Sequence, residues 1–116
     1  GPFEVSRPDP ARVFPRVAPD WRLVVENTLG WEGRKLDVRF EAARGGRRVN
    51  VRPLPELVEL VNALDGKRSL SEAMSEAVGR TPSPEVKAAL ESFVRLMLRS
   101  GPLTARLGDL ELAALG

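Results

Sequence analysis

Apolar and polar residues alternate along three segments in the first half of the chain, at the spacing of β-strands. Between residues 36 and 42 every second residue is apolar, which predicts a strand with one buried and one solvated face. The segments 21–26 and 47–52 are rich in β-branched residues, and Gly45 and Gly46 supply the positive φ that a hairpin turn needs. This pattern predicts a three-stranded antiparallel sheet.

The second half of the chain has the spacing of amphipathic helices, which predicts helices over 55–64, 70–78 and 84–99. Ser69, with a glutamate three residues later, forms a capping-box signature, and Ser83 followed by proline is a favoured helix start. We therefore expect an α+β fold that is winged-helix-like, with the three-stranded antiparallel sheet followed by a three-helix bundle.

Residues 21–103 form the expected domain, and the segments outside it are predicted to be irregular. Residues 1–20 contain five prolines, which block helices and ladder pairing, so we expect an extended arm or linker. The tail 104–116 carries regularly placed leucines and is expected to form a short helix or a frayed end. The first strand is expected to end at Glu26, with a turn signal around Asn27 and Gly30 and a loop over 28–34.

The third predicted helix carries an apolar stripe that is wider than packing in a bundle requires. Such a stripe is buried on more than one side. Either both sides face the core, or one faces the core and the other forms the wall of a groove. At about 100° per residue, the stripe consists of a central sector of Val86, Leu90, Phe93 and Met97, with Val94 and Leu98 on one edge and Ala89 and Leu96 on the other.

The composition argues against catalysis, because the 116 residues include no cysteine, histidine or tyrosine. Without cysteine there are no disulfides, thiolate nucleophiles or cysteine-based metal sites. Without histidine the most common general base and transition-metal ligand are missing. Nothing in the spacing of the remaining polar residues indicates a catalytic site. We therefore expect a binding module with no cofactor and no metal, and not an enzyme.

The formal net charge is only +2, but positive charge is concentrated between residues 34 and 52. Seven basic residues of that segment outnumber two acidic ones, Asp37 and Glu41; the basic residues are Arg34, Lys35, Arg39, Arg44, Arg47, Arg48 and Arg52. Such a field attracts an anionic partner, whether a peptide, a nucleic acid or a phosphate group. The alternative interpretation is a solvated strand face without a partner.

Neither a signal peptide nor a membrane span is evident in the sequence. The N-terminal segment is rich in proline and lacks the apolar region of a secretory signal. No apolar run approaches the ~20 residues that a membrane span needs. We therefore expect a cytoplasmic location and no membrane partner.

The segment Leu64–Ala73, Leu-Asp-Gly-Lys-Arg-Ser-Leu-Ser-Glu-Ala, resembles the Asp-Gly turn and capped helix of the pyrroloquinoline quinone peptide-chaperone family. The likeness continues to Arg99–Leu103, which looks like the helix-ending element of that family, and covers roughly residues 21–103. These proteins are the prototype of the precursor-peptide recognition elements in ribosomal natural-product biosynthesis. The resemblance implies a bacterial, non-catalytic domain that captures the leader segment of a precursor peptide. It would present the peptide to a modifying enzyme, in trans or fused in the native chain.

The resemblance also implies where the peptide binds, because in that family a leader adds as an extra strand beside the third helix. By this resemblance the docking edge is the strand 47–52, whose arginines would suit an acidic leader. The implied peptide-binding residues are Arg47, Arg48, Val49, Asn50, Val51, Arg52, Leu90, Phe93, Val94, Arg95 and Leu98. Each also has a structural interpretation: the apolar residues as core, and the arginines as charges that keep an exposed edge from aggregating.

Two other classes of function use the same elements. A winged-helix DNA-binding domain would read bases with the third helix, but its first turn carries Glu85, and Arg95 and Arg99 lie at the opposite end. A structural docking domain of a larger modifying enzyme would use the Pro-rich start as a linker. The acidic and apolar tail 109–116 is similar to a leader segment and is a candidate to occupy the groove in cis, with a capping helix on the bundle as the alternative.

Overall fold

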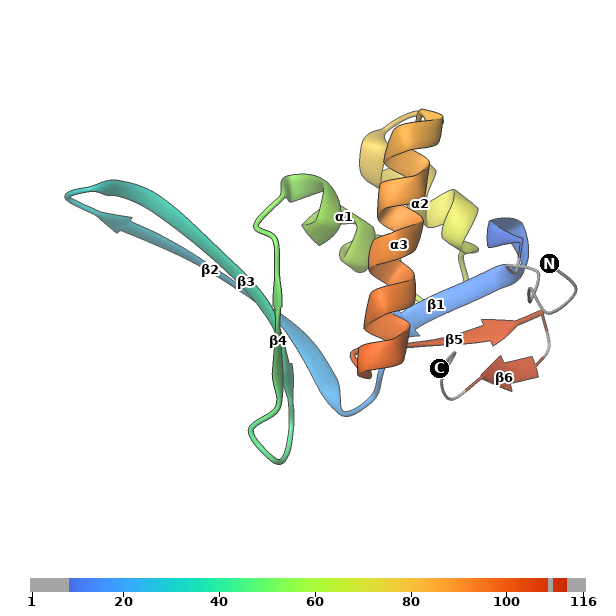
Figure 1. The fold of residues 1–116 in the computed structure, drawn as a ribbon, viewed down its shortest axis with the longest axis horizontal. Helices are drawn as coiled ribbons and strands as arrows, with labels where there is room; N and C mark the ends of the chain where they lie inside the picture. Colours follow the sequence, from blue (N-terminus) through green and yellow to red (C-terminus); the bar gives the residue numbers. More distant parts are fainter. Residues whose placement is uncertain (1–8, 109, 113–116) are drawn as a thin grey trace, which may run out of the picture.

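Residues 9–108 and 110–112 are described by the computed structural model, and within them two three-stranded antiparallel sheets and three α-helices form an α+β fold (Figure 1). One sheet has the strand order β2-β3-β4 and precedes the helices, as the sequence predicts; the other has the order β1-β5-β6. The elements are η1 (Pro10–Arg12), β1 (Val13–Val17), β2 (Trp21–Gly30), β3 (Gly33–Ala42), β4 (Arg48–Val51), α1 (Pro55–Ala63), α2 (Leu70–Val78), α3 (Pro84–Ser100), β5 (Leu103–Leu107) and β6 (Leu110–Leu112).

The hairpin of β2 and β3 is longer than the sequence predicts. Its ladder runs to the pair Gly30↔Gly33, so the expected strand end at Glu26 and the expected loop over 28–34 are wrong. Pairing with the partner strand holds even residues of low strand propensity in the ladder. The outer part of the hairpin extends well beyond the helices (Figure 1).

The inner face of this sheet follows the alternation that the sequence predicts. Val25, Val38 and Val51 lie in one row across the three strands, and Phe40 pairs with Val49 beside them. Phe40 is fully buried. The residues that alternate with this row along each strand, such as Arg39 and Asn50, face outward. The sheet therefore packs one face on the helices and leaves the other to solvent.

The three helices lie within one residue of their predicted bounds, because their ends are marked by local chemistry. The side chain of Ser69 accepts a hydrogen bond from the backbone N–H of Glu72, whose carboxylate accepts one from the N–H of Ser69, so the capping box is confirmed. Ser83 caps α3 through the N–H of Val86. Gly101 ends α3 with a φ of 108°, which only glycine adopts without strain.

The N-terminal segment forms a strand, and our expectation that its prolines prevent ladder pairing is wrong for Val13–Val17. These residues pair with β5, and Pro15 stands opposite Ala105. The N–H of Ala18 donates to the C=O of Pro102 at 2.9 Å, so by alternation the nitrogen of Pro15 faces away from β5. Proline is tolerated at such a position because no donor is needed there.

The tail differs from its prediction in the same way. Leu103–Leu107 is a strand and not a helix, and it lies between β1 and β6. Its residues alternate between apolar and polar, but the run is only five residues long, and the leucines at 103, 107 and 110 also fit the spacing of a helix. Leu110–Leu112 also forms a strand, β6, which pairs with β5 and not with β4, so this part of the candidate leader segment is neither a helix nor an added strand at β4. Residues 109 and 113–116 lie outside the described residues.

Both sheets contribute to one hydrophobic core. Phe40, Leu60, Met74 and Leu103 are its largest fully buried hydrophobic side chains. The buried members are Val13, Val38, Phe40, Val51, Leu57, Leu60, Val61, Ala63, Leu64, Leu70, Ala73, Met74, Leu90, Val94, Met97, Leu98, Leu103 and Ala105. None of the described helices has the length and apolar character needed to cross a membrane.

Candidate functional site

Strand β4 forms a free edge of its sheet. The order β2-β3-β4 leaves one side of β4 without a partner strand among the residues that the structure describes. The N–H of Ala42 donates to the C=O of Arg47 at 2.9 Å, and the antiparallel ladder alternates from this pair. The N–H and C=O groups of Arg48 and Asn50 therefore point to the open edge, where another extended chain can pair with them.

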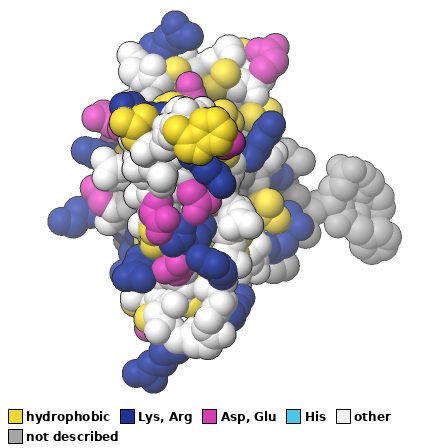
Figure 2. All heavy atoms as spheres, turned by 90° about the vertical axis from the view of Figure 1, so that its left-hand side faces the viewer, with side chains coloured by type: hydrophobic (Ala, Val, Ile, Leu, Met, Phe, Trp, Pro, Cys, Tyr) yellow, Lys and Arg dark blue, Asp and Glu magenta, His cyan; other side chains and the backbone are white. Residues whose placement is uncertain are grey.

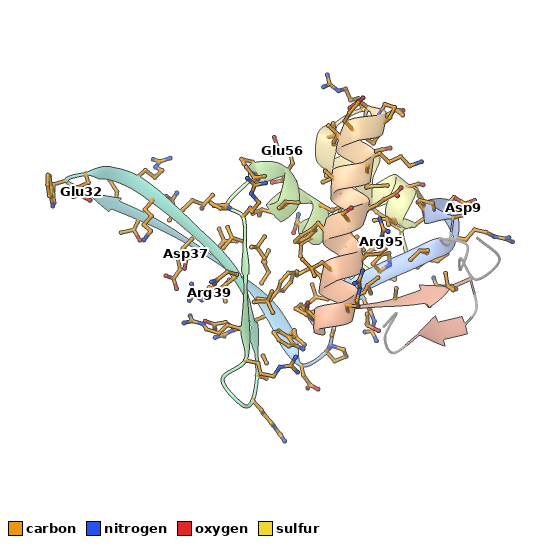
Figure 3. The ribbon with its side chains drawn as sticks, viewed as in Figure 1. Asp9, Glu32, Asp37, Arg39, Glu56 and Arg95 are labelled. Atoms are coloured by element: carbon orange, nitrogen blue, oxygen red, sulfur yellow. The ribbon has the colours of Figure 1, made fainter. Side chains whose placement is uncertain are left out.

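An apolar groove of about 450 Å³ lies beside β4, between the start of α1 and one face of α3. Leu54, Val86 and Leu96 stand at its surface with exposed fractions of 43%, 39% and 53%, which is high for large apolar side chains. Glu56, at the start of α1, also lines it (Figure 3). The lining residues are Asn50, Val51, Arg52, Leu54, Glu56, Leu57, Val86, Ala89, Leu90, Ser92, Phe93, Leu96 and Met97.

The wide apolar stripe of α3 divides between the core and this groove. Val94 and Leu98, on one edge of the stripe, are buried in the core. Ala89 and Leu96, on the other edge, line the groove and are exposed. Of the two arrangements that the sequence allows, the structure thus has the one in which a single helix serves both core and groove wall.

The structure brings five of the predicted site residues to the groove and places the other six elsewhere. Those that line it are Asn50, Val51, Arg52, Leu90 and Phe93. Arg48 and Val49 are on β4 without lining it, and Val94 and Leu98 belong to the core. Arg95 lies on the side of α3 away from β4 (Figure 3).

Arg47 joins the sheet to the end of α3 and does not line the groove. Its guanidinium lies 5.1 Å from the ring centroid of Trp21, a distance typical of a cation–π contact. It also donates a hydrogen bond of 3.1 Å to the C=O of Ser100, at the negative end of the helix dipole. The contacts of Arg47 thus fix the orientation of α3 relative to the sheet.

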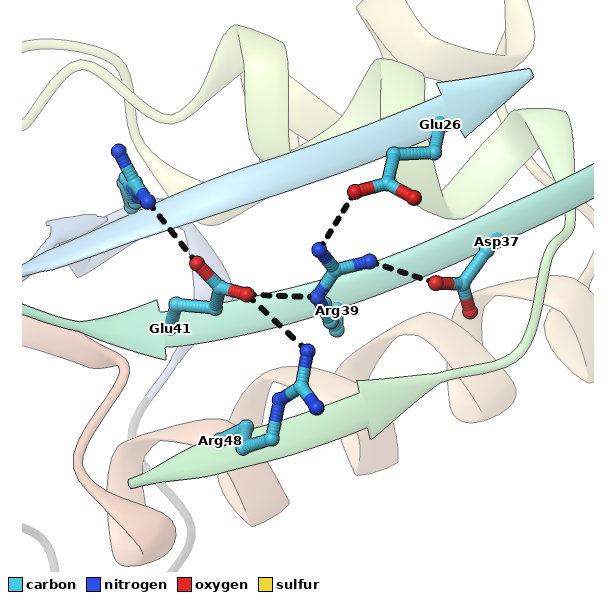
Figure 4. Close-up of polar contacts among 6 residues, drawn as sticks. Glu26, Asp37, Arg39, Glu41 and Arg48 are labelled. Atoms are coloured by element: carbon cyan, nitrogen blue, oxygen red, sulfur yellow. Dashed lines mark hydrogen bonds and ion pairs between the residues drawn. The ribbon is translucent and has the colours of Figure 1, made fainter. Parts of the chain in front are cut away.

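The outward face of the sheet carries a cluster of alternating charges (Figure 4). The guanidinium of Arg39 contacts the carboxylates of Glu26, Asp37 and Glu41. Glu41 also accepts from Arg22 and Arg48, at 3.0 and 3.2 Å. With three guanidinium groups and three carboxylates this cluster is neutral, so the excess positive charge of the basic segment lies outside it, on Arg34, Lys35, Arg44, Arg47 and Arg52.

The same contacts change the acidity of the groups involved. Hydrogen bonds from Arg39 and then from Arg22 lower the pKa of Glu41 from 4.5 to about 2. Hydrogen bonds to Glu26 and Glu41 raise the pKa of Arg39 further above its ordinary value. Both shifts favour the charged forms, because each charge gains a partner of opposite sign.

The Asp-Gly turn before α2 is built by its aspartate. The Asp65 carboxylate accepts hydrogen bonds from the backbone N–H groups of Arg68 and Lys67, at 2.8 and 2.9 Å, and these bonds lower its pKa. Gly66 has a φ of 76°, and a Cβ there would lie 3.2 Å from the side chain of Arg16. The Asp-Gly motif, on which the family resemblance depends, therefore stabilises the turn before α2 in this chain.

Sequence reasoning left several groove residues out of the predicted site, in particular Leu54, Leu57, Val86, Ala89 and Leu96. The stripe on α3 already contained the last three, and its excess width was the signal. Leu54 and Leu57 follow Pro53, and nothing in the sequence indicates that this segment lines a groove together with α3. Their place in the groove follows from tertiary packing.

The described part of the chain contains no group of acidic side chains placed to hold a metal ion. No model of a known protein family matches the chain, and no curated protein matches it.

Proposed function

We propose that this chain is a non-catalytic peptide-binding domain, in which the leader segment of a ribosomally made precursor peptide adds as a strand to the open edge of β4. The observation that carries the proposal is the apolar groove directly beside that edge. The edge supplies backbone hydrogen bonds that any sequence can make, and the groove supplies side-chain selection. A modifying enzyme, in trans or fused in the native chain, would act on the presented peptide.

The resemblance to the peptide-chaperone family supports this proposal. The sheet β2-β3-β4 followed by three helices is compatible with the winged-helix-like layout of that family. In an added strand alternate side chains point to the same face, so every second residue of the peptide would enter the groove. Apolar residues at alternate positions are the expected recognition element.

The rim of the groove carries Arg52 on the side of β4 and Glu56 on the side of α1, and it is Arg52 that supports an acidic residue in the peptide. Arg52 lines the groove, is exposed and has no ion-pair partner among the described residues. Arg48 contacts Glu41 but keeps an exposed side chain. A carboxylate next to an apolar residue in the peptide would therefore pair with Arg52, and rim charges of this kind contribute mainly to specificity and association rate.

The proposal is tested by removing one edge donor while keeping the side-chain environment. Asn50→Pro removes an N–H that faces the open edge and leaves the ladder with β3 intact, whereas Asn50→Ala keeps the N–H and serves as the control. The measurement is fluorescence polarisation with labelled acidic leader segments encoded beside the gene. Both variants lose the side chain of Asn50, which lines the groove, so the N–H accounts for the difference between them. We expect Asn50→Pro to bind at least about tenfold more weakly than Asn50→Ala, which corresponds to about 1.4 kcal/mol.

Circular dichroism and a thermal unfolding curve show whether both variants keep the fold. A mixed-sequence DNA duplex is measured in parallel, over a range of salt concentrations. Equal peptide affinity for both folded variants would exclude strand addition at β4. Salt-sensitive binding of DNA without any peptide signal would favour the winged-helix alternative.

A further inference from the structure

The hairpin of β2 and β3 carries its apolar face beyond the body of the molecule. Leu29 lies on the same face of β2 as Val25 and the buried part of the sheet, but it is 76% exposed. Trp31, in the turn, is 94% exposed. From Val25 to Trp31 a strand spans roughly 20 Å, so these side chains are out of reach of the core.

The exposed large hydrophobic side chains of the described residues fall into two groups. One group is Val25, Leu29 and Trp31 on the hairpin, and the other is Leu54, Val86 and Leu96 around the groove. The first group projects from the surface and the second lines a hollow, so their shapes are complementary. Figure 2, which views the molecule from the side of the hairpin, shows hydrophobic side chains standing at the surface among charged ones.

We propose that two copies of this chain exchange hairpins, with Trp31 and Leu29 of each copy inserted into the apolar groove of the other. The hairpin does not reach the groove of its own molecule. Its ladder is paired along its full length, and it leaves the body pointing away from the helices (Figure 1). Reciprocal insertion forms a closed two-fold dimer with two equal contacts, whereas one-way insertion would continue into a chain of molecules.

The tip of the hairpin and the rim of the groove each carry charges of both signs. Glu32 follows Trp31 in the turn, and Arg34 stands opposite Leu29 on the neighbouring strand. Arg52 and Glu56 line the groove where β4 leads into α1. In the exchanged dimer Glu32 can pair with Arg52 of the second copy and Arg34 with its Glu56, which favours this docking over contact with an uncharged surface.

Exchange of hairpins fills the same groove that we assign to the leader peptide. Dimerisation would therefore compete with peptide binding and keep the apolar groove covered while no peptide is present. The dimer itself requires only the hairpin and the groove of this chain. It does not depend on whether the groove also binds a leader segment.

Sedimentation velocity over a range of protein concentrations tests the dimer. We expect the mass of the parent chain to double as the concentration rises. We expect Trp31→Ser and Leu96→Glu each to remain monomeric, since one lacks the inserted side chain and the other places a charge in the groove. An equimolar mixture of the two variants should form a dimer at higher concentration than the parent does, because the intact hairpin of one fits the intact groove of the other and one of the two contacts remains.

Thr28→Ser is the matched control, because Thr28 is exposed on the opposite face of the same hairpin and should leave the mass increase unchanged. A parent chain that stays monomeric at all concentrations overturns the proposal. So does a Trp31→Ser variant that dimerises like the parent, or a mass that grows without limit. Peptide affinity is measured separately, at concentrations where every variant is monomeric. A lack of peptide binding then counts against the proposed function and not against the dimer.

Discussion

At the scale of single residues, the outward face of the sheet shows how one carboxylate can hold several arginines. Glu41 accepts hydrogen bonds from Arg22, Arg39 and Arg48, which come from three strands. Arg39 in turn contacts Glu26 and Asp37, so each charge has neighbours of opposite sign. Pairs on a solvated face are individually weak, but a network with well-placed guanidinium groups contributes to stability more reliably than an isolated pair.

This network predicts a pH dependence of the unfolding free energy. The pKa of Glu41 is lowered from 4.5 to about 2, so its stabilisation is complete above pH 4.5 and is lost as the pH falls through about 2. We expect Glu41→Gln to unfold at lower urea concentration than the parent at pH 7. The difference should shrink between pH 4.5 and pH 2, and urea titrations followed by circular dichroism measure it.

Glu59→Gln is the control for this experiment, because Glu59 is exposed on α1 and has no ion-pair partner among the described residues. Its urea midpoint should follow that of the parent at every pH. A constant difference between Glu41→Gln and the parent across the acidic range would show that the contribution of Glu41 does not depend on its charge.

At the scale of elements, the start of α2 combines a turn and a cap. Asp65 fixes the turn through two backbone N–H groups, and Ser69 and Glu72 satisfy the first free donors of the helix. Ser69 is itself buried, so its hydroxyl has little access to water. The helix contributes Leu70, Ala73 and Met74 to the core, and therefore its start also determines how the core packs.

We expect Ser69→Ala to lower the free energy of unfolding by about 1 kcal/mol, because the N–H of Glu72 loses its partner. Chemical denaturation monitored by tryptophan fluorescence and by circular dichroism gives this difference. Ser69→Asp, which can still accept the hydrogen bond, should restore part of it. If Ser69→Ala were as stable as the parent, the capping bond would not contribute to folding.

The elements that the sequence predicts well are those whose signals are local. The alternation over 36–42, the glycines of the β3–β4 turn and the serine caps each determine an element within a few residues. β1 lacks such a signal, because Pro15 is acceptable only when its nitrogen faces away from the partner strand. The alternation of β5 covers only five residues, and its leucines also fit a helical spacing. The groove has no local signal either, because Leu54 and the residues of α3 that line it are far apart in sequence.

At the scale of the whole molecule, the first and last described strands act together. β1 pairs with β5 along Val13–Val17, and the N–H of Gly66 donates to the C=O of Pro15 at 2.9 Å. On β5, Leu103 and Ala105 are buried in the same core as the helices. β5 follows directly after α3, so its pairing with β1 supports the end of this helix. The same end of α3 forms one wall of the groove.

This connection predicts that a chain beginning at Trp21 is much less stable than one beginning at Asp9. The shorter chain loses Val13 and exposes Leu103, and burial of a large apolar side chain contributes about 1.5–3 kcal/mol. We therefore expect a lower urea midpoint and weaker binding of the leader peptide, since the end of α3 loses its support. The chain that begins at Asp9 keeps every described element and is the control. Equal midpoints for the two chains would show that residues 21–103 fold independently, and that β1 merely covers a core that is already stable.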